Sequence, residues 1–131
     1  MLDWIAALSN PQPILAVYGE AVPTLDDVRI EELCLSVNGP VLRLRFDLAE
    51  FPVNPPVKWR RDGLDVVQVE ISFGGVRAIS VDQFSTDSIC DLKIRKDGLI
   101  AFSSESDSVH FEGLAETATI LRISAYAMDR A

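Results

Sequence analysis

The sequence is poor in the residues that carry most catalytic and metal-binding chemistry. It contains one histidine, His110, and two cysteines, Cys34 and Cys90. A zinc site needs several closely spaced ligands, so the sequence predicts no metal centre, and nothing in it points to a cofactor. A lone histidine without a recognisable nucleophile motif also predicts no catalytic residues. We therefore expect His110 to be structural and the protein not to be an enzyme.

The two cysteines lie in separate strand-like segments without a Cys-x-x-Cys spacing. We expect both to be small buried side chains that stay as thiols in a reducing compartment. Two arrangements are compatible with the pattern. The thiols are buried apart from each other, or the strands bring them side by side.

Basic residues and long apolar runs are also scarce. Twelve Lys and Arg stand against 20 Asp and Glu, a net charge of -8. Nucleic-acid binding requires a basic face, so we expect no nucleic-acid partner. The excess acid suits a basic protein partner, or it only keeps the protein soluble. No apolar run approaches the roughly 18 residues of a membrane span, and Asp3 stands where a secretion signal carries Lys or Arg, so we expect a cytoplasmic protein without a membrane partner.

What the sequence does contain is apolar and polar alternation. Its 131 residues predict a single domain over residues 1–131. Alternation predicts strands at 28–37, 41–48, 66–73, 76–81, 90–95, 99–103, 109–112 and 117–128, with a bulge near Glu31-Glu32. Residues 117–128 could also partly form a helix, but their Thr and Ile content favours a strand. Hairpins are predicted at Asn38-Gly39, Gly74-Gly75 and Asp97-Gly98. Residues 2–8 and 11–18 are predicted helices, the second capped by Asn10.

These elements predict a mainly β (α+β) fold. We expect an antiparallel meander sheet or a sandwich of about eight short strands, with the N-terminal helices packed on one face. Residues 51–59 connect two of the strands and contain three prolines, Pro52, Pro55 and Pro56. Each proline fixes its own φ and extends the residue before it, so a stiff loop is predicted, with Trp59 packed flat on the prolines.

Short motifs along the chain carry a resemblance to a known family. The most distinctive is Pro55-Pro56-Val57-Lys58-Trp59. The others are Trp4, Tyr18-Gly19-Glu20, Pro23-Thr24-Leu25, Gly39-Pro40, Phe46-Asp47-Leu48, Phe51-Pro52 and Ile123-Ser124-Ala125-Tyr126. Together they resemble immunity protein fifty, a family of bacterial polymorphic toxin systems. The resemblance implies an antitoxin that neutralises a cognate toxin by direct protein–protein binding.

The candidate partner-binding residues are acidic clusters at turns and solvent-facing strand positions, together with an aromatic and basic pair. Acidic clusters can steer a basic partner, and Trp and Arg are enriched in the tightest parts of interfaces. The residues are Asp26, Asp27, Glu31, Glu32, Glu105, Asp107, Glu112, Trp59 and Arg60. The alternative is that the acids are a solvated surface and that Trp59 caps the core.

Two further function classes stay open. Paired carboxylates on a β scaffold could belong to a small-molecule or carbohydrate-binding domain, for which a concave pocket would be the sign. A structural or oligomerisation module would show an open strand edge or a symmetric interface. The sequence also leaves open whether an antitoxin of this kind forms a homo-oligomer.

Overall fold

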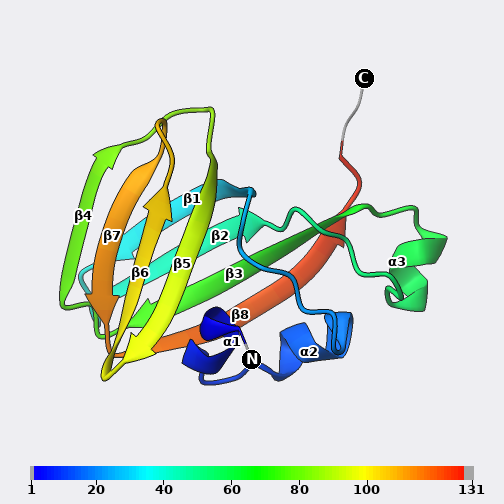
Figure 1. Cartoon of the computed structure of the whole chain (residues 1–131), viewed down its shortest axis with the longest axis horizontal. Coiled ribbons are helices and arrows are strands. Elements are labelled where there is room, and N and C mark those ends of the chain that lie inside the picture. The colour runs from blue at the N-terminus through cyan, green and yellow to red at the C-terminus, as the bar shows by residue number, and fades with distance from the viewer. Residues whose placement is uncertain (1, 129–131) are drawn as a thin grey trace.

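The computed structural model describes residues 2–128 and confirms the mainly β fold class (Figure 1). Three short helices accompany eight strands in this part of the chain. The helices are α1 (Asp3–Ala7), α2 (Gln12–Tyr18) and α3 (Val57–Arg61). The strands are β1 (Val28–Ser36), β2 (Val41–Asp47), β3 (Val66–Gly74), β4 (Ala78–Gln83), β5 (Ile89–Asp97), β6 (Leu99–Glu105), β7 (His110–Ala115) and β8 (Thr117–Tyr126).

The strands form one open antiparallel sheet in the order β4-β7-β6-β5-β1-β2-β3-β8. Its centre is a weak junction, because β1 and β5 pair only at Val28–Cys90 and Arg29–Ile89. We call β1, β2, β3 and β8 the β2 half, and β4, β5, β6 and β7 the β6 half. The predicted hairpins at Asn38-Gly39 and Asp97-Gly98 are confirmed as β1–β2 and β5–β6.

The hairpin predicted at Gly74-Gly75 is wrong. Both sides of β3 are already occupied, by β2 and by β8, so β4 cannot pair with it. After Gly75 the chain crosses instead to the far edge of the sheet, where β4 pairs with β7. The crossing is held by the Val76 N–H, which donates to the Pro40 carbonyl at 3.0 Å, and the Arg77 N–H, which donates to Leu114 at 2.8 Å.

The inner faces of the two halves meet in the core. Phe73 of β3 and Phe102 of β6 stack with ring centroids 4.3 Å apart. Helices α1 and α2 lie on the same inner side, α1 along β5 and α2 against β8, as expected for the N-terminal helices (Figure 1). Alternation explains the core, because every second residue of a half-buried strand faces inward. The buried strand positions include Leu42, Leu44, Phe46, Val67, Val69, Ile71, Phe73, Cys90, Leu92 and Ile94.

The predicted bulge in β1 is confirmed as a register shift between Ile30 and Glu32. Beyond the bulge, Cys34 faces outward and is half-buried, with its Sγ 3.3 Å from an Arg43 guanidinium nitrogen. The expectation that Cys34 is buried is therefore wrong, because the bulge changes the face that it occupies. Cys90 is buried on the inner face, and both cysteines are free. The two thiols are apart for two reasons. They lie on opposite faces of the sheet, and Cys34 is six residues along β1 from Val28, the residue that pairs with Cys90.

Asn10 does not cap α2, contrary to the sequence prediction. The position before α2 is Pro11, and it makes no side-chain cap. The Asn10 amide instead bonds the free edge of β8, donating to the Ile120 carbonyl at 2.9 Å and accepting the Ile120 N–H at 2.7 Å. The Ser9 N–H adds a bond to the Ala118 carbonyl at 2.8 Å. A side-chain amide has a donor and an acceptor side by side, so it replaces a missing strand better than it caps a helix.

The proline connector is not entirely a loop, because its last residues form α3. The Pro56 carbonyl accepts the N–H of Trp59 at 3.0 Å and that of Arg60 at 3.2 Å. Proline suits this position, since the first residues of a helix have no N–H partner to lose. The half-buried Trp59 ring lies 6.2 Å from Phe51, tilted by 45°. Its aromatic neighbour is thus Phe51, and the packing of Trp59 on the prolines stays a prediction.

None of the helices within residues 2–128 combines the length and the apolarity that a bilayer span requires.

Candidate functional site

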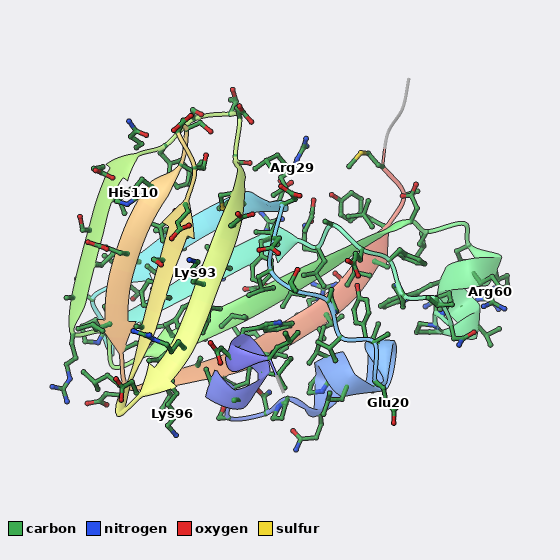
Figure 2. The ribbon with its side chains drawn as sticks, viewed as in Figure 1. Glu20, Arg29, Arg60, Lys93, Lys96 and His110 are labelled. Carbon is green, nitrogen blue, oxygen red and sulfur yellow. The ribbon has the colours of Figure 1, made fainter. Side chains whose placement is uncertain are left out.

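An open groove of about 890 Å³ lies on the outer face of the β6 half. Strand register builds it, because residues directly opposite each other in neighbouring strands share a face. The two rows across β5, β6, β7 and β4 are Arg95, Ala101, Leu114, Ala78 and Lys93, Ser103, Glu112, Ser80. The side chains of β6 and β4 in these rows are Ala or Ser. They are shorter than those of β5 and β7, so the surface is hollow over β6 and β4. Figure 2 shows Lys93 on this outer face.

Helix α1 borders the groove along β5. Because β5 pairs with β1 over only two residue pairs, the rest of that edge is free for other segments. The Leu92 N–H donates to the Leu25 carbonyl at 2.9 Å, which fixes the segment before β1 alongside β5. The buried Trp4 indole donates to the Pro23 carbonyl at 3.0 Å and anchors α1 on the same segment. Leu2, Asp3, Trp4 and Thr24 thereby line the groove.

One end of the groove is acidic. Asp91 of β5 and Glu105 of β6 lie directly opposite each other, one row beyond Lys93 and Ser103. The Asp27 N–H donates to Asp91 Oδ1 at 3.0 Å, which brings the turn before β1 to the same place. We call the carboxylates at this end the acidic rim: Asp26, Asp27, Asp82, Asp91, Glu105 and Asp107.

Few cations balance the acidic rim. Lys93 Nζ lies 3.0 Å from Glu105, and the His110 ring bonds Asp82. Within residues 2–128, Lys93 is the one lysine or arginine paired with these six carboxylates, so the rim keeps a clear negative excess. Like charges directly opposite in neighbouring strands destabilise a sheet. Of this opposed pair, Glu105 is paired with Lys93, whereas Asp91 has no cationic partner within residues 2–128.

The other end of the groove is basic. Arg95 and Lys96 lie there just before Asp97, the last residue of β5, and Arg77 precedes β4, with its guanidinium 2.6 Å from Glu116, so basic residues outnumber the acidic ones. Figure 2 shows His110 and Lys96 at opposite ends of the β6 half. The groove therefore runs from an acidic to a basic end, and a bound partner would be oriented by this charge separation.

The outer face of the β2 half is also polar, but its charges are balanced. One row across β1, β2, β3 and β8 alternates in sign: Glu32, Arg45, Glu70 and Arg122. Arg43 lies 3.3 Å from Glu70, and Arg45 lies 4.0 Å from Glu32. These residues line a small hollow of about 320 Å³. A row that neutralises itself has less need of a charged partner.

A buried carboxylate joins the strands of this β2 half. Asp47 is 4% exposed, and it accepts hydrogen bonds from the Tyr126 hydroxyl and, at 3.0 Å, from the Gln68 amide. Glu31 lies against Asp47. The pKa of Glu31 is raised, first by burial and then by Asp47. Sequence reasoning did not single out Asp47 or Tyr126 as a pair. The available signal was that both lie in motifs that carry the family resemblance.

The structure brings together only part of the predicted partner-binding set. Asp26, Asp27, Glu105 and Asp107 gather at the acidic rim, and Glu112 lies in the groove beside it. Glu31 and Glu32 lie on the outer face of the β2 half. Trp59 and Arg60 lie on α3, on the opposite side of the molecule from β4 (Figure 1). Within the described chain, no group of His, Cys, Asp and Glu is arranged to hold a metal ion.

Residues 10–126 match the family model described as Immunity protein 50. The chain belongs to this family. The match spans both halves of the sheet together with α2 and α3, and it begins at Asn10, which closes the edge of β8 in this Immunity protein 50 chain. Searches of curated proteins and of solved structures found no match.

Proposed function

We propose that this protein is a cytoplasmic antitoxin that neutralises a cognate toxin by binding it directly, without catalysis. Membership of the Immunity protein 50 family supports a toxin partner. The observation that carries the choice of surface is the acidic rim next to the groove. Toxins that cut nucleic acid need basic sites, and an acidic surface covering such a site would exclude the substrate.

Binding would proceed in two physical steps. Uncompensated carboxylates at the rim attract a basic toxin at long range and raise the association rate. The groove then takes up a protruding segment of the toxin, and side chains around it complete an interface of the usual size, roughly 1,600 Å² in total. Because the bound antitoxin only covers the toxin, protection requires one antitoxin for each toxin. An excess of toxin must therefore restore toxicity.

The first experiment tests the function itself. The chain is co-expressed and co-purified with the toxin domain encoded next to its gene, and growth of the producing cells is measured. We expect a stable complex and protection that saturates at equal amounts of the two proteins. Cells that die at the same rate with and without the chain would exclude the antitoxin function.

The second experiment tests the surface. Neutralising two rim carboxylates, Glu105→Gln with Asp107→Asn, should lower the association rate by about 10-fold at low salt and weaken its salt dependence. The matched control is Glu20→Gln with Glu50→Gln, which removes the same charge from exposed loop positions away from the groove. Equal rates for both double variants, or rates indifferent to salt in the parent protein, would exclude steering by the rim.

A small-molecule or carbohydrate-binding domain is the second candidate. The groove volume of about 890 Å³ favours it, because small-ligand sites measure roughly 300–1,000 Å³. Thermal unfolding in the presence of a panel of sugars and nucleotides distinguishes the two functions. This candidate would be supported by a ligand that raises the Tm of the parent protein but not the Tm of the Ser103→Trp variant. A Tm that rises only with the toxin supports the antitoxin.

A further inference from the structure

The two edges of the sheet differ in how they are protected. Ser9 and Asn10 cover the free edge of β8 with backbone and side-chain hydrogen bonds. No strand or backbone hydrogen bond from anywhere in residues 2–128 covers the outer edge of β4. An uncovered edge presents unpaired N–H and C=O groups, which makes it a template for another strand. The open edge also lies next to the groove.

Strand β4 carries exposed apolar surface at this edge. Val81 is 46% exposed, and Ile79, which shares its face, is half-buried. Proteins commonly protect such edges with charge, and β4 has only Asp82, which is engaged by His110. A strand that pairs with β4 would cover Val81 and complete the backbone hydrogen bonds of the edge.

We propose that β4 pairs antiparallel with β4 of a second copy of this chain. The proposal rests on the strand edge and does not depend on toxin binding. A two-fold axis at Ser80 places Ser80 opposite its own copy and Ile79 opposite Val81, twice. Ala78 then faces Asp82, so the two aspartates do not oppose each other. Apolar pairs directly opposite are the contacts that stabilise antiparallel strands.

Charge favours this orientation. Antiparallel pairing brings the acidic rim of one copy towards the basic end of the other, where Arg77, Arg95 and Lys96 lie. Arg77, which directly precedes β4, lies towards the Asp82 end of the other copy. The attraction between unlike ends offsets part of the repulsion between two chains of net charge -8. A parallel arrangement would place the two acidic rims together.

Pairing of the two β4 strands would join the grooves of the two copies. A two-fold axis perpendicular to the sheet keeps both outer faces on the same side, so two grooves would form one continuous surface. The register shift between Val81 and Gln83 limits the regular pairing to a short stretch. A contact of this length is smaller than the interface of a tight dimer. We therefore expect a weak dimer whose population depends on concentration.

Sedimentation velocity of the purified chain tests the dimer between about 10 μM and 1 mM, a span suited to a small interface. The mean mass should rise from 14.4 kDa towards twice that value. Val81→Lys should weaken the association by about 10-fold or more, because it places a charge in both apolar pairs. The control is Val57→Lys, the same substitution at an exposed position of α3. A mass of 14.4 kDa at every concentration overturns the proposal.

A cysteine at the two-fold axis tests the register. Ser80→Cys should form a disulfide-linked dimer under mild oxidation, because the two residues 80 face each other at the distance of a cross-strand pair. The parent chain controls for Cys34, and Ser103→Cys controls for a thiol two strands inward on the same face. Cross-linking of Ser80→Cys no faster than of Ser103→Cys overturns the register. If Val81→Lys weakens toxin capture while the parent chain is monomeric, β4 binds the toxin, and self-pairing is excluded without affecting the antitoxin function.

Discussion

Gly113 of β7 lies where the inner face of the β6 half leaves no room for a side chain. It pairs with Phe102 on one side and with Ile79 on the other. A Cβ at this position would overlap the tip of the Phe102 ring and would lie 2.7 Å from the backbone carbonyl of Ala78. The ring can rotate only by disturbing its stack on Phe73, and the carbonyl can move only by shifting β4. Gly113→Ala is therefore expected to destabilise the whole β6 half.

The size of the effect follows from these contacts. Overpacking costs about 1–3 kcal/mol, and the upper end applies because one of the two neighbours is backbone. Replacing glycine by alanine in a strand returns about 0.5–1 kcal/mol of chain entropy. The net loss of unfolding free energy is about 2 kcal/mol. With an unfolding entropy of about 2.1 cal/mol/K per residue over 131 residues, roughly 0.28 kcal/mol/K, the Tm should fall by about 7 °C.

Urea titration and calorimetry of four proteins test this expectation: the parent, Gly113→Ala, Phe102→Leu and the double variant. Phe102→Leu replaces the ring that the new methyl group would meet with a shorter side chain. The two losses should therefore fail to add, and the double variant should be about 1 kcal/mol more stable than the sum predicts. Additive losses, or a change below about 0.5 kcal/mol for Gly113→Ala, would refute the packing argument.

Two more predictions concern titratable groups. Burial raises the pKa of Cys90 to about 11, and the side chain is shielded, so a thiol reagent at pH 8 should label one cysteine, Cys34, in the folded protein and both after unfolding. Labelling of both in the native state would contradict the placement of Cys90. Burial and Asp47 raise the pKa of Glu31, so the folded state binds its proton more tightly than the unfolded state, and stability falls as the pH rises above the ordinary value of 4.5. Glu31→Gln should therefore stabilise the protein near neutral pH by about 0.5 kcal/mol after allowing for solvent screening, with the gain disappearing below about pH 4. A gain that is the same at every pH would exclude this origin.

The inner face of the sheet could be predicted from the sequence because it depends on one strong physical signal. A strand with one buried side repeats every two residues, and Leu42, Leu44 and Phe46 follow that period without interruption. The bulge at Glu31-Glu32 was visible as a slip in the same pattern. Its effect on Cys34 was missed, since the sequence does not show where the period of two resumes.

The order of strands could not be predicted, because a turn does not determine which strand is the partner. Gly74-Gly75 looks the same whether β4 returns to β3 or crosses the sheet. The outcome depends on β8, which lies more than 40 residues later and occupies the side of β3 that β4 would need. Asn10 shows the same limit, because its two candidate roles, capping α2 or covering β8, differ only in the tertiary structure.

The acidic rim was predicted in pieces and assembled only by the register of β5 and β6. Asp27 and Glu105 are far apart in the sequence and meet because both approach Asp91. Nothing local marks Asp91, which alternates with the core residues Cys90 and Leu92 like any solvent-facing position. For the same reason Glu31 and Trp59 could not be separated from the rim before the fold was known.

The two outer faces of the sheet differ in what a partner would have to displace. On the β2 half, binding a basic toxin at Glu32 or Glu70 would first break their pairs with Arg45 and Arg43, and the gain would be offset by the arginines left without partners. On the β6 half, Glu105 is likewise paired with Lys93, but Asp91 opposite it and Asp27 beside it make no ion pair within residues 2–128, so a basic partner can approach these two carboxylates without breaking one. Binding of a basic partner is therefore favourable on the outer face of the β6 half and nearly neutral on that of the β2 half. This difference, more than the number of acidic residues, directs a basic partner to the acidic rim.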